Sequence, residues 1–196
     1  MSRVRQMIAL DAALAKTYAT WNPIGLDSHA QLSNGNLDVT GMNFNSITWN
    51  VKSIVKMPAI TGIVGSWQAE FTIISRSVED VYSIIGFGDS VESNFVGHGN
   101  SIGWESNGNL IGGNTIKGTI DSYDVGDILG IVVDPLGYVT FYKNGVSELY
   151  TPTSYFTTAV NLYFMVTLAT SAHISANFGQ SPMAFPVVGA NQGLFQ

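Results

Sequence analysis

The stretch from Gly126 to Val146 constrains the fold of this chain more than any other. Residues 128–133 form an almost unbroken apolar run rich in β-branched side chains, which is typical of a strand covered on both faces. Residues 134–137, Asp-Pro-Leu-Gly, have the preferences of a type I turn, and residues 138–143 form a second strand rich in aromatic and β-branched side chains. Asn144 and Gly145 both tolerate positive φ and can close a hairpin. The stretch therefore predicts an antiparallel meander.

Further β signals extend along the chain from Trp21 onward. Residues 29–32 and 37–40 flank Asn34-Gly35, which is a hairpin signal. Residues 67–74 alternate between apolar and polar side chains, as in a strand with one face in water. Because turn signals recur about every 8–12 residues, we expect an all-β fold, an antiparallel two-sheet β-sandwich. The pattern alone leaves a closed barrel open as the alternative.

Five motifs, in this order along the chain, resemble those of SPRY domains. They are Trp21-Asn22-Pro23 with the turn at residues 32–36, then residues 65–71, 85–88, the meander at 126–146, and 176–185. The resemblance covers about Trp21 to Phe185 and implies a SPRY/concanavalin-like jelly roll that serves as a binding module. It does not identify the ligand. The closing motif and the absence of cysteine are most similar to SPRY domains in tailed-phage virion proteins.

Residues 2–18 are the convincing helix candidate. Their apolar stripe has spacings of three, four and four residues, and consists of Met7, Leu10, Leu14 and Tyr18. We therefore expect three parts: a helical arm at 1–20, a SPRY-like sandwich at 21–186 and a C-terminal tail at 187–196. Either the arm packs on a neighbouring subunit as an assembly arm, or it folds back onto its own sandwich.

Charged residues make up only 11% of the chain, and the formal net charge is −6. This acidic balance lacks the basic footprint of nucleic-acid binding. No apolar run reaches transmembrane length, and Asp11 and Lys16 interrupt the N-terminal apolar stretch, so we expect neither membrane insertion nor a signal peptide. A surface with few charges can be buried without desolvating many ions, which favours a homo-oligomer or a larger assembly.

The residue types needed for catalysis are dispersed. The chain has three histidines, His29, His98 and His173, in different regions, and it lacks a Gly-x-Ser-x-Gly elbow. Carboxylates that lie close in sequence are Asp89 with Glu92, and Asp121, Asp124 and Asp127. A glycosidase would need two carboxyls across a cleft, whereas Asp127 at a strand start and Asp134 in a turn are explained by bonds to the main chain. We therefore predict no enzyme activity, no cofactor and no metal site.

The region from Gly88 to Gly118 is rich in glycine and asparagine, which predicts loops presented by the scaffold. We expect it to form an exposed interaction surface, with the Asn34–Asn36 turn beside it. Trp104 has two interpretations: its ring stacks on a sugar while nearby amides bind hydroxyls, or it packs inward from a strand. The candidate contact residues are Asn34, Asn36, His98, Trp104, Asn107, Asn109 and Asn114.

Three functions are compatible with these patterns. The first is a non-enzymatic structural or interaction module of a phage particle, on the tail, baseplate or capsid surface, with other virion proteins as partners. The alternative is an adhesin that binds a host-surface glycan. The least favoured is a polysaccharide hydrolase, because no convergent acid–base set is present.

Overall fold

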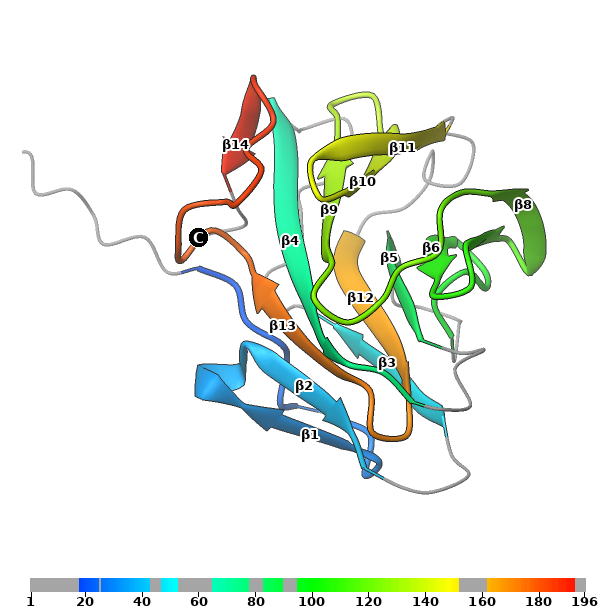
Figure 1. The fold of residues 1–196 in the computed structure, drawn as a ribbon, viewed down its shortest axis with the longest axis vertical. Helices are drawn as coiled ribbons and strands as arrows, with labels where there is room; N and C mark the ends of the chain where they lie inside the picture. The colour runs from blue at the N-terminus through cyan, green and yellow to red at the C-terminus, as the bar shows by residue number, and fades with distance from the viewer. Residues whose placement is uncertain are drawn as a thin grey trace, which may run out of the picture.

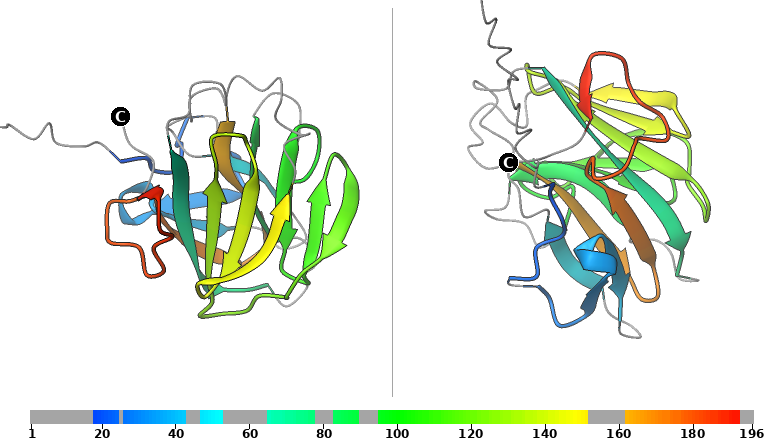
Figure 2. Two further views of the ribbon diagram at one scale, coloured as in Figure 1. Left: turned by 90° about the horizontal axis from the view of Figure 1, so that it is seen from above. Right: turned by 90° about the vertical axis from the view of Figure 1, so that its left-hand side faces the viewer.

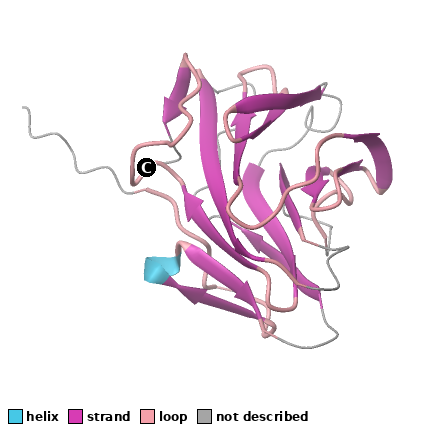
Figure 3. Cartoon of the chain, in the orientation of Figure 1, coloured by secondary structure: helices cyan, strands magenta, loops and turns pink. Residues whose placement is uncertain are grey.

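The computed structural model describes residues 18–24, 26–42, 47–52, 65–77, 83–89, 95–151 and 162–192. Over these residues the chain forms strands and one short 3₁₀ turn, Asn34–Asn36 (Figure 3). The strands pair into a larger and a smaller sheet that face each other, with the smaller sheet behind in Figure 1. The predicted two-sheet antiparallel β-sandwich is confirmed, and the two separate sheets rule out the closed barrel.

The larger sheet has eight strands in the order β1-β2-β13-β4-β9-β10-β11, with β14 pairing to β4. Its strands are β1 (Ala30–Ser33), β2 (Asp38–Gly41), β4 (Ser66–Ser75), β9 (Ile128–Val133), β10 (Val139–Lys143), β11 (Val146–Thr151), β13 (His173–Asn177) and β14 (Ala190–Gln192).

The smaller sheet has six strands in the order β3-β12-β5-β6-β7-β8. They are β3 (Ile47–Lys52), β5 (Ile84–Asp89), β6 (Ser101–Glu105), β7 (Asn109–Gly112), β8 (Thr115–Thr119) and β12 (Leu162–Ala169). Every pairing among the described strands is antiparallel, except the parallel pairing of β14 with β4.

The predicted meander forms β9 and β10 of the larger sheet, next to its edge strand β11. β9 covers the predicted residues 128–133 and pairs with β4 on one side and β10 on the other. The Asp134 carboxylate accepts hydrogen bonds from the N–H groups of Leu136 and Tyr138, at 2.8 and 2.9 Å, which closes the predicted turn. Ile131, in the middle of β9, is fully buried. The covered strand and its turn are therefore as the sequence predicts.

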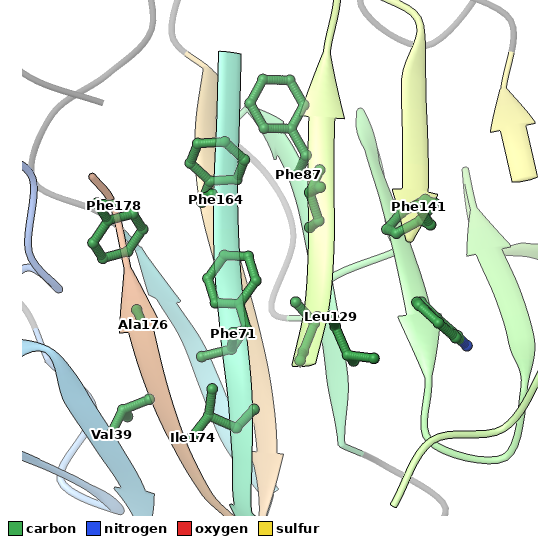
Figure 4. Packing of buried hydrophobic residues seen from close by; sticks show 14 of the residues in the cluster. Val39, Phe71, Phe87, Leu129, Phe141, Phe164, Ile174, Ala176 and Phe178 are labelled. Carbon is green, nitrogen blue, oxygen red and sulfur yellow. The ribbon is translucent and has the colours of Figure 1, made fainter. Parts of the chain in front are cut away.

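The core between the sheets combines aliphatic side chains with a set of packed aromatic rings (Figure 4). Phe71 of β4 and Phe164 of β12 face each other across the sandwich with ring centroids 6.0 Å apart. Trp21 packs edge-on against Phe178 at 5.1 Å, and its indole Nε1 donates to the Leu37 carbonyl at 2.9 Å. The opening and closing motifs of the chain thus meet in one core. The Trp21 ring can be buried there because its one polar atom has a hydrogen-bond partner.

The two ends of the chain differ from the three predicted parts. Residues 1–17, including Met7, Leu10 and Leu14, lie outside the described residues, while Tyr18 lies in an isolated β-bridge and not in a helix. Ala19 is buried in the core, so the sandwich begins before Trp21. At the other end, β14 pairs with residues 66–68 of β4, so residues 190–192 belong to the sheet and the predicted separate tail is wrong for them.

Residues 183–189, which we call the Phe185 strap, cross the outer face of the larger sheet between β13 and β14. The Glu70 carboxylate accepts hydrogen bonds from the N–H groups of Ala184 and Phe185, both at 2.7 Å. The Gln68 side chain donates to the Phe185 carbonyl at 2.8 Å and accepts from the Val187 N–H at 2.9 Å. Both polar side chains are buried, and the strap supplies the partners that buried polar groups require.

Candidate functional site

The sequence-predicted contact residues do not form one surface. His98 and Asn114 come together at one end of β6, β7 and β8, whereas Asn107 and Asn109 lie at the other end of the same strands. The Asn34–Asn36 turn joins β1 to β2 at the far side of the molecule from β8, as the views in Figures 1 and 2 agree. The expectation that this turn lies beside the Gly88–Gly118 region is therefore wrong.

Trp104 lies in the core and is 0% exposed. Its ring packs edge-on against Tyr123 and Phe141, with centroids 5.5 and 6.0 Å apart. Its Nε1 donates to the Asp121 carbonyl at 2.8 Å. Because neither face of the ring is open, it cannot stack on a ligand, and the inward-packing interpretation of Trp104 is the correct one.

Asn107 and Asn109 serve the turn between β6 and β7. The Asn107 side-chain oxygen accepts the Asn109 N–H at 2.9 Å. The Asn109 amide donates to a carboxylate oxygen of Glu105, also at 2.9 Å. Glu105 is buried, so this hydrogen bond satisfies an acid that is shielded from water. Asn107 is exposed, whereas the Asn109 amide is already hydrogen-bonded within the fold. The Asn109 amide is therefore not free to contact a ligand at this end.

At the opposite end, a hydrogen-bonded set of loops forms what we call the His98–Asn114 rim: Asp89, His98, Gly99, Asn100 and Asn114. The Asn114 side-chain oxygen accepts the Gly99 N–H at 3.0 Å. The Asn100 amide donates to an Asp89 carboxylate oxygen at 3.1 Å. Asn114 has a left-handed backbone (φ 66°), which asparagine tolerates better than most residues. His98, Gly99, Asn100 and Asn114 are all exposed, so the rim is a surface of groups that can both donate and accept hydrogen bonds.

Three of the rim residues, His98 to Asn100, belong to a segment that is anchored on the smaller sheet, residues 95–100, which we call the Val96 strap. Val96 is fully buried against Ile84 and Met165 on the outer face of the smaller sheet. Its N–H donates to the Thr167 hydroxyl at 3.0 Å. A Cβ at Gly103 would lie 2.6 Å from Val96 Cγ1, so glycine at this strand position leaves the space that Val96 fills.

The prediction of an exposed Gly88–Gly118 surface therefore holds for part of that region only. All five residues of β6 are buried, and Leu110 of β7 is in the core. Several glycines there allow close packing of strands and do not form loops. Composition alone cannot distinguish these two uses of glycine. Sequence reasoning considered Asp89 only as a possible catalytic carboxylate, and it did not single out Asn100 or Phe95, whose half-buried ring lies 5.4 Å from the His98 ring. The repeated Asn and Gly around residues 97–100 were the only available signal for Asn100.

Two of the carboxylates considered for acid–base chemistry, Asp124 and Asp127, hold a loop together, while Glu92 lies outside the described residues. Asp127 accepts the Asp124 N–H at 2.8 Å and the Asn144 amide at 2.7 Å, and its carboxylate lies 3.4 Å from Lys143 Nζ. Burial of Asp127 acts to raise its pKa, but the hydrogen bonds and the Lys143 charge outweigh it and lower the pKa. The pKa of Asp124 is lowered by the Val125 N–H and by Arg76, whose Nη1 lies 3.3 Å away. Both groups are therefore stabilised as ions, opposite to what a general acid needs.

No group of three or more metal-ligating His, Asp or Glu side chains occurs among the residues that the structure describes. No helix within the described ranges is long and apolar enough to cross a membrane. The titratable members of the His98–Asn114 rim are Asp89 and His98. The rim therefore offers hydrogen bonding, with little charge, to whatever it contacts.

At the level of sequence, no protein-family model and no curated protein matches the chain. Among solved structures, the human HERC1 SPRY domain superposes with a TM-score of 0.64 at 18% identity, over 83% of this chain and 99% of that one. The TRIM65 PSpry domain gives 0.63 at 15% identity, over 82% and 92%. Stonustoxin gives 0.59 at 14% identity, and 27% of its chain is covered. The chain therefore has a SPRY-like fold.

Proposed function

We propose that this chain is a non-enzymatic protein-binding module that uses the His98–Asn114 rim as its contact surface. The observation that carries the proposal is the construction of the rim. Exposed, mostly uncharged hydrogen-bonding groups are fixed on a strap that the smaller sheet anchors through buried Val96. A surface that is ordered before binding loses less conformational entropy when it binds, which favours recognition of another folded surface.

We further propose that the partners are other proteins of a phage particle and that the chain is a structural component of that particle. Support comes from the sequence resemblance to tailed-phage SPRY domains and from the low content of charged residues, 11%. Burying such a surface in an assembly carries a small desolvation cost. Host-glycan binding loses its main support, because Trp104 is buried and no stacking ring is available from it.

The proposed place of the chain in a phage particle is tested by mass spectrometry of purified intact particles from a culture that expresses the chain. We expect the chain in particles that survive density-gradient purification, in a constant ratio to the other particle proteins. If the chain is found only in the unassembled fraction, the proposed role in the virion is wrong, whether or not the rim binds a protein.

The surface is tested separately, with a photo-crosslinking residue at His98 and a matched one at Asn107, which is also exposed but lies at the other end of the strands. We expect a crosslink to another particle protein from position 98 and none from position 107. Equal crosslinking from both positions would place the interface elsewhere. A glycan-array signal that His98→Ala removes and Asn107→Ala leaves intact would favour the adhesin over the protein-binding module.

A further inference from the structure

Three Asn-Gly dipeptides occur in the chain, at residues 34–35, 107–108 and 144–145. In such a dipeptide the deprotonated glycine backbone nitrogen can attack the asparagine side-chain carbon Cγ. A C–N bond forms, the Cγ–Nδ2 bond breaks and ammonia leaves, giving a five-membered succinimide. Water then opens the ring at either carbonyl and yields aspartate or isoaspartate. The step needs an asparagine amide that can rotate and a glycine nitrogen that is open to approach.

At two of the three dipeptides the fold restrains these groups. The Asn144 amide is held at both atoms, since its oxygen accepts the Ile128 N–H at 2.9 Å and its nitrogen donates to Asp127 at 2.7 Å. At Asn107 the side-chain oxygen holds the Asn109 N–H at 2.9 Å. The attacking nitrogen is restrained as well, because the Gly108 N–H donates to the Glu105 carbonyl at 2.9 Å. Each reaction must first break one or two of these hydrogen bonds.

The third dipeptide, Asn34-Gly35, is the least restrained of the three. Both residues are exposed, and a Cβ at Gly35 would meet no atom within 4 Å. The Asn34 amide makes one long hydrogen bond, 3.3 Å to Asp38 Oδ1, and the Gly35 N–H makes none to any described residue. Both residues have left-handed backbones, φ 51° and 64°, in a turn of three residues. Asn34-Gly35 is therefore the dipeptide whose amide is held by one long hydrogen bond and whose attacking nitrogen is held by no described residue.

We propose that Asn34 is a site of spontaneous, water-dependent deamidation, and that the folded chain directs this modification to Asn34 and away from Asn107 and Asn144. The reactants are the Gly35 nitrogen and water, and the products are ammonia and a carboxylate at position 34, in aspartate or isoaspartate form. No enzyme, metal or oxidant is required.

The modification acts on a turn that fixes the start of the sandwich. The Asn36 carbonyl accepts the Trp21 N–H at 2.8 Å, and the Leu37 carbonyl accepts the Trp21 indole Nε1–H. The Asn34 carbonyl accepts the Leu37 N–H at 3.2 Å, which closes the turn. A carboxylate at 34 would face Asp38 in place of a donating amide, and like charges at that distance repel. Isoaspartate would also insert an extra backbone carbon. Deamidation therefore loosens the attachment of the chain before Trp21.

The full-length protein is incubated in warm, mildly alkaline buffer, and each Asn-Gly peptide is quantified by mass spectrometry, with isoaspartate assayed by enzymatic carboxyl methylation. We expect Asn34 to react roughly five- to thirtyfold faster than Asn107 and Asn144, because breaking one or two hydrogen bonds adds about 1–2 kcal/mol to their barriers. The same incubation in concentrated urea is the control, and there all three sites should react at similar rates. Equal rates in the folded protein, or a preference for Asn34 that persists in urea, would overturn the proposal.

The consequence is tested with Asn34→Asp and the double variant Asn34→Asp/Asp38→Asn. We expect Asn34→Asp to accelerate hydrogen exchange at the Trp21 N–H by several-fold, and the double variant to recover part of the protection. If Asn34→Asp leaves exchange at Trp21 unchanged, the turn does not transmit the modification to the N-terminal segment, and that part of the inference is wrong.

Discussion

At the residue scale, buried polar side chains in this sandwich bind main-chain segments that cross the sheets. Glu70 is 4% exposed, and both of its carboxylate oxygens accept N–H groups of the Phe185 strap. Thr167, fully buried in the smaller sheet, accepts the N–H of Val96. In each case a side chain that would be costly to bury alone is satisfied by a strap that would otherwise have unpaired amides. Each buried polar side chain and the strap that it binds therefore stabilise the fold as one unit.

Glu70→Gln tests this unit with little change in volume. The variant replaces one acceptor oxygen with an NH₂ group that faces a strap N–H, so one hydrogen bond becomes a donor–donor contact. We expect the free energy of unfolding to fall by roughly 1.5–3 kcal/mol, the range for hydrogen bonds to charged groups. Urea denaturation followed by tryptophan fluorescence measures the change. An unchanged denaturation midpoint would mean that the carboxylate does not hold the strap.

The lowered pKa values of Asp124 and Asp127 give a second prediction at this scale. A carboxyl whose folded pKa lies below its ordinary value of 3.8 stabilises the fold above that value, and the contribution is lost as pH falls through the folded pKa. We expect Asp127→Asn to be less stable than the unsubstituted protein near neutral pH, and the difference to shrink as the pH drops below 3.8. Melting temperature against pH for both proteins gives the comparison. A difference that grows on acidification would show that the pKa of Asp127 is raised.

At the element scale, the smaller sheet has a packed outer face as well as a packed inner one. Ile84, Val96 and Met165 form a small apolar cluster there, and Tyr163 packs against it. Glycines in β5 and β6 make the room, because a Cβ at Gly86 would collide with Val96 and with the Ile102 main chain. The Val96 strap is thus placed by the absence of side chains on the strands below it.

Gly103→Ala with Val96→Ala tests this packing as a double-mutant cycle. A Cβ at Gly103 would lie 2.5 Å from Ile84 Cγ2 and 2.6 Å from Val96 Cγ1, so we expect Gly103→Ala to cost roughly 1–3 kcal/mol through overpacking. In the presence of Val96→Ala the same substitution should cost less, because one of the two colliding methyl groups is gone. Urea denaturation provides the four stabilities. The matched control is Gly118→Ala, where a Cβ would meet nothing within 4 Å. A fully additive cycle would contradict the contact.

The elements differ in how well their sequences predict them. The sequence predicts β9 and β10 because their turns carry Asp, Pro, Asn and Gly at positions where each has a specific role, and because their apolar runs are long. The Val96 strap could not be predicted, because the sequence does not distinguish a glycine that makes room in a strand from a glycine in a loop. Trp104 has the same ambiguity: an aromatic residue among asparagines indicates a sugar site or a core ring, and only the pairing of β6 with β5 and β7 decides between them.

At the scale of the whole molecule, each sheet carries a strap on its outer face, and the exposed hydrogen-bonding groups of the rim lie at one end of the smaller sheet. The predicted assembly arm is attached to this body at Tyr18, beside buried Ala19 and Trp21. Since those two residues complete the core at the opening motif, the described sandwich has its own closed interior. Whether residues 1–17 act on the fold or on assembly is therefore a separable question.

Deletion of residues 1–17 tests whether this segment is needed for the fold or for assembly. We expect the truncated protein to keep a melting temperature within a few degrees of the full chain, because the core residues it retains include Ala19 and Trp21. We also expect it to lose self-association, measured by size-exclusion chromatography with light scattering. A substitution outside the arm, Thr119→Ala on exposed β8, is the control for association. If the truncated protein unfolds, the arm belongs to its own core; if it still assembles, the arm is not the assembly element.

The parallel pairing of β14 with β4 also has a consequence for synthesis on the ribosome. Gln68 bonds the Phe185 carbonyl across 117 residues of chain, so β4 emerges long before the segment that covers its polar outer face. Until then Gln68 and Glu70 stand in water on an open sheet edge, where their polarity discourages pairing with another nascent chain. Contacts so distant in sequence form late and slow the final folding step. Completion of the larger sheet should therefore wait until β14 has left the exit tunnel and can pair with β4.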